Sequence, residues 1–357
     1  MNLFTRFSLA LLSTNLLFTG STAVPHYPKL AKRLPDNWKL YNEWVSMLDV
    51  QPYTYEGDAC GDMGTFNRGT RTLTWVTDNS EEMVVTWEKN PIAQNMAAVY
   101  KGTLQVKKDG EVQSTQDVAV KRDRGDGANG VVYGASLQMR LEGNENILGA
   151  LGAVFSNDPT AGNAIMAYVP ATSLEQNFGS YSNQDSVNSA FKQILSAVAA
   201  VQSAGIIHRD LKPENFLLDG STLKLIDFDT AIEAASSDET NVGTATYAAP
   251  EIVSQKTKSG GPYTNKVDTF SIGMTFLVMS VPELRDANTR FDLWRNLIEP
   301  NDELWPSAST VASILKGKNY GVFSGNDNLL NVLSNALCES DTRYDPQSFK
   351  SAFENAV

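Results

Sequence analysis

Four polar residues near the middle of the chain have the types and the spacing that phosphoryl transfer requires. Asp210, Lys212 and Asn215 lie together in one short segment, and Asp227 follows soon after it. This chemistry needs a carboxylate that accepts a hydroxyl proton, a cation beside the transferring phosphate, and oxygen atoms that hold Mg²⁺. Asp210 would accept the proton and Lys212 would face the phosphate, so these two are the predicted catalytic residues. Asn215 and Asp227 would hold the metal, either Mg²⁺ or Mn²⁺.

The surrounding sequence separates a catalytic segment from an ordinary solvated turn, in which Asp, Lys and Asn also gather. A turn does not predict the apolar run at residues 223–226, which leads into Asp227, nor the later block Ala249, Pro250 and Glu251. In this order the blocks resemble the catalytic core of eukaryotic protein kinases. The resemblance implies an α+β, bilobal fold, with a small β-rich N-lobe, a larger helical C-lobe, and ATP between them.

The elements that must position these residues follow the same order. Residues 83–170 are expected to form the N-lobe and hinge, and residues 171–357 the C-lobe. Three β-rich runs are predicted strands: residues 83–87, 97–106 and 112–121. An Asp-Gly pair at 109–110 predicts a hairpin between the last two. A short helix is expected at 136–141, and the apolar spacing of residues 185–204 predicts an amphipathic helix.

Lys121 ends a Val-Ala-Val-Lys run that resembles the strand motif whose lysine holds the α and β phosphates of ATP. Alone, such a lysine is more often a residue of an edge strand. Its place after two predicted strands and before the catalytic segment makes it the leading phosphate ligand.

The resemblance also places the adenine site. Ile92 and Val99 lie at the two ends of the predicted nucleotide loop, and Met166 is the expected gatekeeper. Ala167 and Val169 would meet adenine through backbone groups at the hinge. The alternative for these last residues is an ordinary buried strand.

Several residues indicate a Ser/Thr kinase and its structural supports. Lys212 is typical of Ser/Thr kinases, and Thr244 matches the threonine that braces the catalytic Asp and Lys in that group. Asp268 resembles the helix aspartate that ties down the catalytic loop. Arg343 lies where the family's late arginine pairs with a glutamate, here Glu251.

Arg209 next to the catalytic Asp could pair with a phosphate on the activation segment, residues 228–250. The candidate acceptors of that phosphate are Ser236, Ser237, Thr240 and Thr246.

Three departures from the family pattern bear on activity. The nucleotide loop at residues 92–99 has no glycine, which should weaken backbone contact with phosphate. Gly134 or Ala135 stands where the family has a helix glutamate that pairs with the strand lysine, and Glu142 is the nearest acid on that segment. If no acid replaces the glutamate, Lys121 would be held less firmly. Asp229 stands where the family has glycine, which predicts strain if the backbone there is left-handed, and adds negative charge near the metal.

These features favour a secreted Ser/Thr protein kinase that transfers the γ-phosphate of ATP to protein hydroxyls. The alternative is a secreted pseudokinase that binds a nucleotide or a partner without turnover. A small-molecule phosphotransferase would also use a catalytic aspartate and a metal-holding asparagine. Such families usually lack both a lysine like Lys212 and an Ala-Pro-Glu block.

The start of the chain suggests export. Residues 1–23 combine a positive Arg6, a mostly apolar stretch and small residues for cleavage, which together predict a secretory signal peptide. An uncleaved anchor is the alternative. Residues 24–82 form an extension with no recognisable motif, in which Lys32 and Arg33 could be a processing site.

Charge and cysteine content narrow the partners. The net charge of −12 disfavours nucleic acid, whose binding requires Lys and Arg. The resemblance to protein kinases implies protein substrate and ATP as the partners. Beyond the signal peptide no segment reaches the length of a membrane span. Of the two cysteines, Cys338 lies in an apolar segment and is predicted to be a buried thiol, although one bridge to Cys60 is possible. An oligomeric state is not indicated.

Overall fold

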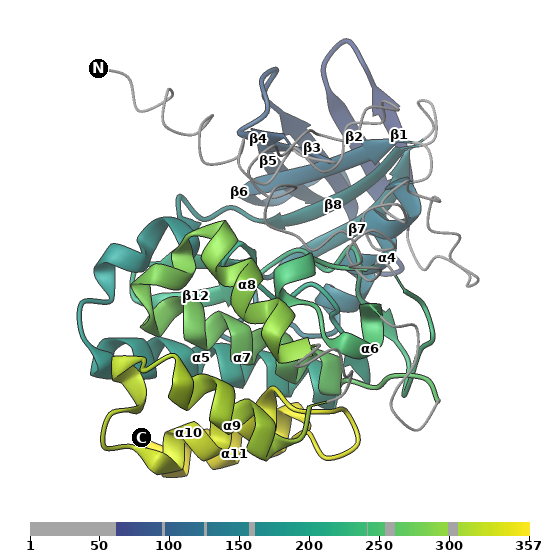
Figure 1. Ribbon diagram of the computed structural model, residues 1–357. Coiled ribbons are helices and arrows are strands. Elements are labelled where there is room, and N and C mark those ends of the chain that lie inside the picture. Colours follow the sequence, from purple (N-terminus) through teal and green to yellow (C-terminus); the bar gives the residue numbers. More distant parts are fainter. Residues whose placement is uncertain are drawn as a thin grey trace, which may run out of the picture.

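The computed structural model describes residues 62–94, 97–124, 127–156, 161–240, 242–253, 261–298 and 306–357. Figure 1 shows a β-rich N-terminal region set against a helical C-terminal region, which confirms the predicted α+β, bilobal fold. The predicted signal peptide, the pair Lys32 and Arg33, and Cys60 lie outside the described residues.

The strands of the N-lobe form one sheet that closes on itself. They are β1 (Asp62–Asn67), β2 (Thr72–Val76), β3 (Glu82–Trp87), β4 (Ala93–Gln94), β5 (Ala98–Lys108), β6 (Glu111–Arg124), β7 (Ala150–Ser156) and β8 (Ala161–Ala167). Their order is β3-β2-β1-β7-β8-β6-β5-β4, and β3 also pairs with β5. Because of this last pairing, every strand except β4 belongs to a closed barrel.

Alternating side chains fill the barrel. Leu73 and Trp75 of β2 and Val85 of β3 are buried, as are Leu104 of β5 and Val120 of β6, and all five belong to one apolar cluster. This alternation is the strand period of two, with one face turned to the core. The hairpin between β5 and β6 turns at Asp109 and Gly110, whose φ values of 52° and 82° are those of the tight turn predicted from the Asp-Gly pair.

The predicted boundary between residues 82 and 83 does not divide the structure. β1 and β2, which fall in the predicted extension, are strands of the same sheet as β3 and β7. Leu73 and Trp75 are part of the barrel core, so these strands cannot be separate from the N-lobe. Residues 24–61 lie outside the described part of the chain.

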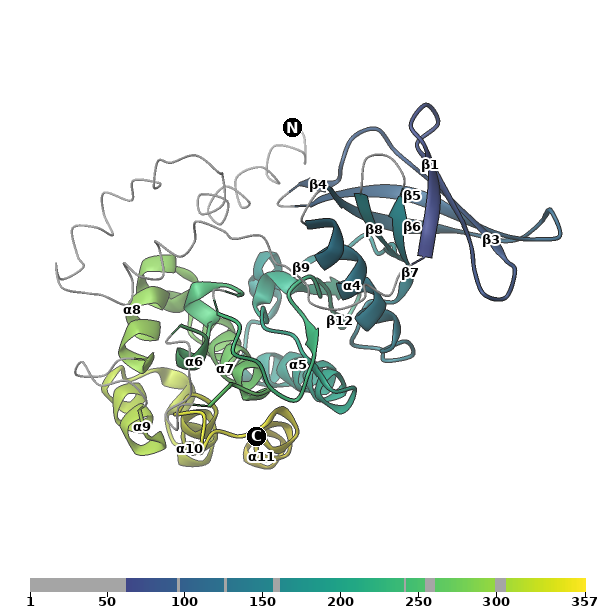
Figure 2. The same ribbon diagram turned by 90° about the vertical axis from the view of Figure 1, so that its right-hand side faces the viewer.

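The N-lobe helix is longer than predicted and begins earlier. α4 spans Gly127–Met139, whereas only residues 136–141 were expected to be helical. Its first half is glycine-rich, yet Val131, Val132 and Ala135 supply an apolar face that packs on Ala153 and Ala164 of the sheet. This burial outweighs the low helix propensity of glycine. Figure 2 shows α4 between the sheet and the helical region.

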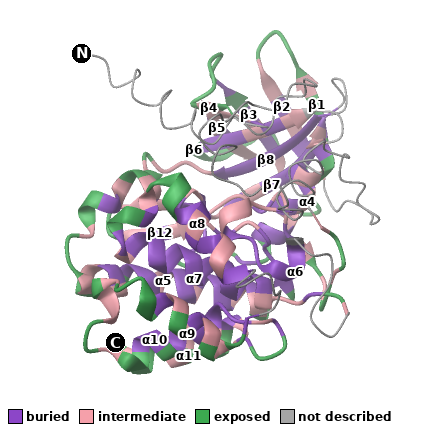
Figure 3. Ribbon diagram, viewed as in Figure 1, coloured by how far each residue is buried: buried purple, intermediate pink, exposed green. Residues whose placement is uncertain are grey.

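The C-lobe is built around two buried helices. Its helices are α5 (Gln184–Ser203), α6 (Pro250–Val253), α7 (Lys266–Ser280), α8 (Ala287–Ile298), α9 (Ala308–Gly317), α10 (Asp327–Ala336) and α11 (Pro346–Ala356). The prediction of a helix at 185–204 is confirmed by α5, whose start carries a capping box of Asn183 and Ser186. Buried residues cover almost the whole of α7 (Figure 3). Phe191 of α5 packs edge-on against Phe276 of α7, with ring centroids 4.8 Å apart.

Short strands connect the catalytic segments to this helical core. They are β9 (Thr172–Ser173), β10 (Ile206–Ile207), β11 (Phe216–Asp219), β12 (Thr222–Leu225) and β13 (Ile232–Glu233). β11 and β12 form a hairpin, and β10 pairs with β13. Cys338 is fully buried as a free thiol, as predicted. Within the described part of the chain, no helix combines the length and the apolar character needed to cross a membrane.

Candidate active site

The predicted catalytic residues lie in the loop between β10 and β11. Lys212 Nζ is 2.8 Å from Asp210 Oδ2, and it donates a hydrogen bond to Thr244 Oγ1 at 2.7 Å. The Thr244 hydroxyl in turn donates to Asp210 Oδ1 at 2.7 Å. Both carboxylate oxygens of Asp210 are therefore fixed in direction, and the predicted bracing by Thr244 is confirmed.

Asn215 also contacts Asp210. Its amide nitrogen donates to the Asp210 carbonyl oxygen at 2.7 Å and to Asp210 Oδ2 at 3.2 Å. Asn215 closes a short 3₁₀ turn, Pro213–Asn215, immediately before β11. Because the amide nitrogen is committed to Asp210, the amide oxygen is the atom that a cation would meet.

The loop is anchored from below by Asp268 of α7. Its carboxylate accepts backbone N–H donors from His208 and Arg209, each at 2.8 Å, which confirms the predicted tie between this helix and the loop. Burial raises the pKa of the Asp268 carboxyl to about 6, while the two backbone donors act in the opposite direction.

His208 is a buried residue that packs inside the catalytic loop. Its ring is fully buried and meets the Phe228 ring edge-on at 4.7 Å. Burial lowers the pKa of His208 to about 4, although the carboxylates of Asp210 and Asp227 act to raise it. The imidazole is therefore neutral at physiological pH.

Lys121 of β6 contacts two carboxylates of the segment after β12. Its Nζ lies 2.7 Å from Asp227 Oδ1 and 2.7 Å from Asp229 Oδ2. Burial acts to raise the pKa of Asp227, but Lys121 outweighs it and lowers that pKa to about 2. Partial burial raises the pKa of Asp229 to about 6. The two carboxylates outweigh burial at the lysine and raise the Lys121 pKa above its ordinary value.

The backbone strain in this segment lies at Asp227 rather than at Asp229. Asp227 has a φ of 65°, in the left-handed region that side chains other than glycine rarely adopt. Asp229 is not among the described residues with positive φ. The left-handed backbone on which the predicted strain at Asp229 depended is therefore not present, and an aspartate is accommodated there without strain.

Gly134 of α4 abuts the same segment. A Cβ atom at this position would lie 2.5 Å from the carbonyl oxygen of Phe228 and 3.0 Å from the backbone nitrogen of Asp229. No side chain fits between the helix and this backbone. α4 carries no acidic residue at any position, in agreement with the predicted absence of a helix acid.

Four of the five predicted adenine-site residues come together in one apolar cluster. Val99, Ala167 and Val169 pack, partly buried, with buried Met166. Ile92 lies outside this cluster and its side chain is 43% exposed. The backbone nitrogen of Ala167 already donates to the Gly149 carbonyl at 2.9 Å.

The cluster also contains residues that sequence reasoning missed. Ala119, Leu148, Leu217 and Ile226 belong to it. Three of them neighbour a predicted site residue, because Ala119 precedes Lys121 by two positions, Leu217 follows Asn215 by two, and Ile226 directly precedes Asp227. Closeness in sequence to a predicted site residue was therefore the signal that could have identified these three.

Arg209 contacts a carboxylate of the activation segment. Its guanidinium Nη1 donates to Glu239 Oε2 and, at 3.2 Å, to the Tyr263 hydroxyl oxygen, while Nε donates to the Thr230 carbonyl at 2.6 Å. The partner in the structure is thus a glutamate, not one of the hydroxyl residues considered as phosphate acceptors.

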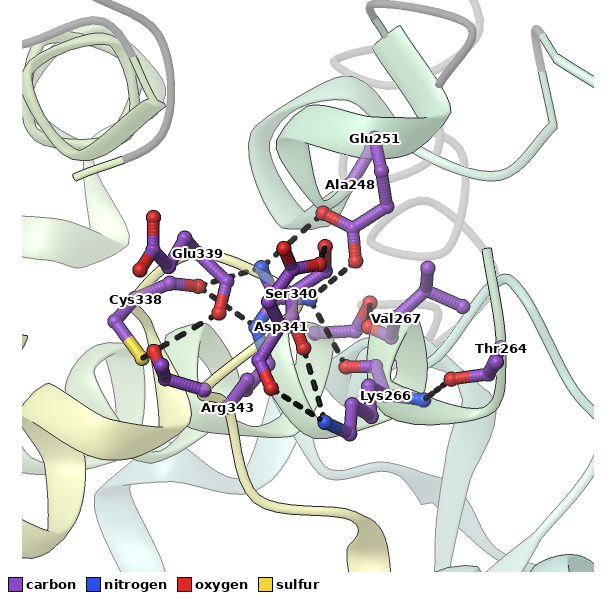
Figure 4. Close-up of polar contacts among 12 residues, drawn as sticks. Ala248, Glu251, Thr264, Lys266, Val267, Cys338, Glu339, Ser340, Asp341 and Arg343 are labelled. Atoms are coloured by element: carbon purple, nitrogen blue, oxygen red, sulfur yellow. Dashed lines mark hydrogen bonds and ion pairs between the residues drawn. The ribbon is translucent and has the colours of Figure 1, made fainter. Parts of the chain in front are cut away.

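The predicted pair of Glu251 and Arg343 is confirmed (Figure 4). Arg343 Nη1 donates to Glu251 Oε1, and Nη2 lies 3.1 Å from Oε2. Both side chains are buried, and the guanidinium also donates to the carbonyls of Cys338 and Lys266. This pair joins the end of the activation segment to the C-lobe core.

Comparison with known proteins agrees with this geometry. The chain is similar to CBL-interacting protein kinase 28 of Oryza sativa subsp. japonica, at 41% identity over 103 residues, which are 27% of this chain and 23% of that protein. It is similar to serine/threonine-protein kinase H1 of Homo sapiens, at 33% identity over 147 residues, 38% of this chain and 33% of that protein. The chain spans a third or less of the length of these two relatives.

A longer match extends over more of the chain. A probable serine/threonine-protein kinase of Encephalitozoon cuniculi is 30% identical over 208 residues, 54% of this chain and 38% of that protein. The family model described as Protein kinase domain matches residues 96–343, a range that contains Lys121, Asp210, Asp227 and Arg343. Because this match covers more than half of the 357 residues, the chain belongs to the protein kinase domain family.

Proposed function

We propose that this chain is a Ser/Thr protein kinase that transfers the γ-phosphate of ATP to hydroxyl groups of proteins. The observation that carries the proposal is the closed set of contacts among Asp210, Lys212 and Thr244. A catalytic base and a phosphate-facing cation held by one hydroxyl are preorganised for phosphoryl transfer. The Ser/Thr kinases among the similar proteins support the same chemistry.

Each residue of the site has a distinct role in this proposal. Asp210 accepts the proton of the substrate hydroxyl, and Lys212 lies beside the transferring phosphate and offsets its charge. Lys121 contacts the α and β phosphates. The apolar cluster of Val99, Met166 and its neighbours receives the adenine ring.

Asn215 and Asp227 would hold Mg²⁺ or Mn²⁺. Their donor set of one carboxylate and one amide oxygen suits a hard divalent cation, and the low pKa of Asp227 keeps it ionised. When bound, the metal neutralises charge on the phosphates.

The chain retains the contacts that a pseudokinase would be free to lose. Asp227 is held by Lys121, and Asn215 is held by Asp210. These contacts favour turnover over nucleotide binding alone.

Secretion is part of the proposal because residues 1–23 have the pattern of a signal peptide. Expression of the full chain in a eukaryotic secretory host, followed by N-terminal sequencing of protein from the medium, tests it. A mature start near residue 24 is expected. Retention of all the protein inside the cells with an intact Met1 would contradict it.

Phosphoamino-acid analysis tests the reaction itself. The full chain is incubated with Mg²⁺, radiolabelled ATP and a generic protein substrate, beside a Lys121→Met variant. We expect phosphoserine and phosphothreonine from the parent chain and at least about 10²-fold less product from the variant, because a phosphate contact is lost. Phosphotyrosine alone would overturn the Ser/Thr assignment, and equal product from both chains would overturn the role of Lys121.

A further inference from the structure

Lys121 contacts two carboxylates in a family where the partner of this lysine is a glutamate on the N-lobe helix. The two oxygens are Asp227 Oδ1 and Asp229 Oδ2, each 2.7 Å from Nζ. The side chain of Lys121 is only 13% exposed, so few other groups can reach its charge. An ammonium group removed from water in this way requires a carboxylate partner.

Helix α4 cannot supply that partner. It has no acidic residue, and Gly134 leaves no room for a side chain against Phe228 and Asp229. The helix and the segment 227–229 have exchanged residue types relative to the family pattern: the helix carries the glycine and the segment carries the acid. The closeness of the helix backbone to this segment means that a side chain at position 134 could not reach Lys121.

Asp227 alone cannot keep Lys121 in place during the reaction. In the proposed function, on which this inference rests, the Asp227 carboxylate is committed to the metal. Asp229 is then the carboxylate that remains for the lysine. The negative charge of Asp229 balances the ammonium group of Lys121, so Asp227 is left available to hold the metal.

The position of Asp229 is set by its neighbours along the chain. The Phe228 ring is buried against His208, and the Thr230 hydroxyl donates to the His208 carbonyl at 2.9 Å. The Ala231 backbone nitrogen donates to the Phe228 carbonyl at 2.9 Å, which closes a turn around Asp229. Because the backbone is held on both sides of Asp229, its short side chain can orient a lysine without a large loss of entropy.

We propose that Asp229 is a positioning residue, which holds Lys121 toward the nucleotide phosphates in the role that the family assigns to the helix glutamate. The chain therefore keeps the lysine–carboxylate pair of an active kinase but takes the carboxylate from the activation segment.

Nucleotide titration of full-chain variants tests this role. Asp229→Asn removes the charge and keeps the shape, and Asp229→Glu restores a carboxylate. Asp219→Asn is the matched control, since Asp219 is also half-buried but belongs to β11, and no contact with Lys121 is seen. For each chain, the Kd of Mg-ATP, kcat, KM for ATP and the melting temperature without nucleotide are measured.

We expect Asp229→Asn to lower kcat/KM for ATP by at least about 10-fold, through a higher Kd and KM or a lower kcat. Its melting temperature should stay close to that of the parent. Asp229→Glu should recover most of the loss, and Asp219→Asn should match the parent. Kd and kcat/KM of Asp229→Asn within twofold of the parent would overturn the proposal, as would equal losses in the Asn and Glu variants. A parent chain that binds no Mg-ATP would overturn the proposed function as well, whereas a parent that binds and turns over with an unaffected Asn variant would overturn this inference alone.

Discussion

The chemistry of single residues in this site depends on charges that are buried together. The ammonium group of Lys121 contacts the carboxylates of Asp227 and Asp229. The carboxylate oxygens of Asp210 contact Lys212, Thr244 and Asn215. In both groups, each charge has a partner before any ligand is bound. Such preorganisation lowers the reorganisation that the reaction would otherwise require.

The buried neutral His208 makes stability depend on pH. The unfolded chain protonates this ring near its ordinary pKa of 6.5, whereas the folded chain does so only near 4. Between these values the unfolded state binds more protons, so the free energy of unfolding falls as the pH is lowered, by up to about 3 kcal/mol near pH 4. A His208→Phe variant keeps the ring contact with Phe228 and lacks this dependence.

Urea unfolding of the parent and His208→Phe chains at several pH values measures the effect. The difference in unfolding free energy between the two should shift in favour of the variant as the pH falls from 7 to 4. Taking the difference cancels the groups common to both chains. A difference that stays constant over this range would contradict a depressed pKa.

At the scale of elements, a carboxylate of the activation segment contacts the arginine beside the catalytic aspartate. Glu239 contacts the buried Arg209, and the backbone of Ser237 pairs with that of Tyr263 in both directions at 2.8 Å. Arg209, which was expected to pair with a phosphate on this segment, therefore contacts a carboxylate of the segment's own sequence.

We predict that activity does not require phosphorylation of this segment. Phosphatase-treated protein should keep its kcat, whereas Glu239→Gln should lower kcat about 10-fold, because Arg209 loses its charged partner. Asp238→Asn, the adjacent exposed acid, is the control and should behave as the parent. Loss of activity on phosphatase treatment, confirmed by mass spectrometry of the segment, would show that a phosphate is needed after all.

At the scale of the whole molecule, the N-lobe is a closed barrel rather than an open sheet. β1 joins β7 by parallel pairing and β3 joins β5, so the strands before residue 82 complete the wall. Closure buries Trp75 and Leu73 in the same core as Val120 of the strand that carries Lys121. The barrel therefore supports the position of the phosphate-binding lysine.

A Trp75→Ala variant measures how far β2 supports this lobe. Trp75 is 3% exposed, and truncation of such a residue costs about 3–5 kcal/mol of unfolding free energy. Val76→Ala, at a neighbouring residue that is 61% exposed, should cost less than about 0.5 kcal/mol. Urea denaturation of both variants gives the comparison, and similar losses in the two would mean that β1 and β2 are not integral to the lobe.

Sequence motifs and local patterns predicted much of this architecture, but not the pairing of β1 with β7 or the start of α4. The Asp-Gly hairpin, α5, and the contacts of Thr244, Asp268 and Arg343 all follow from residue types in a recognisable order. The barrel could not be predicted, because parallel pairing of β1 with β7 leaves no local trace in either strand. The start of α4 was missed because its glycines conceal an apolar face that only the sheet reveals.

The same limit applies within the site. The types of Asp210 and Lys121 identified them, but Asp229 was predicted to introduce strain and extra charge because its partner lies more than 100 residues away in the sequence. Glu239 carried no signal at all, since an exposed acid in a loop is ordinary. Residues that do chemistry, and supports such as Thr244 that belong to a recognisable motif, were therefore predictable, whereas Asp229 and Glu239, which lie outside such motifs, were not.

The most direct test of the account is the initial rate of γ-phosphate transfer from Mg-ATP to a protein substrate, measured for the parent chain and for Asp210→Asn at equal concentration. The variant keeps the shape of the side chain and loses the proton acceptor. The account predicts transfer by the parent and a rate lower by about 10²–10⁴-fold in the variant. Equal rates for the two chains, or no transfer by a parent chain that binds Mg-ATP, would contradict it.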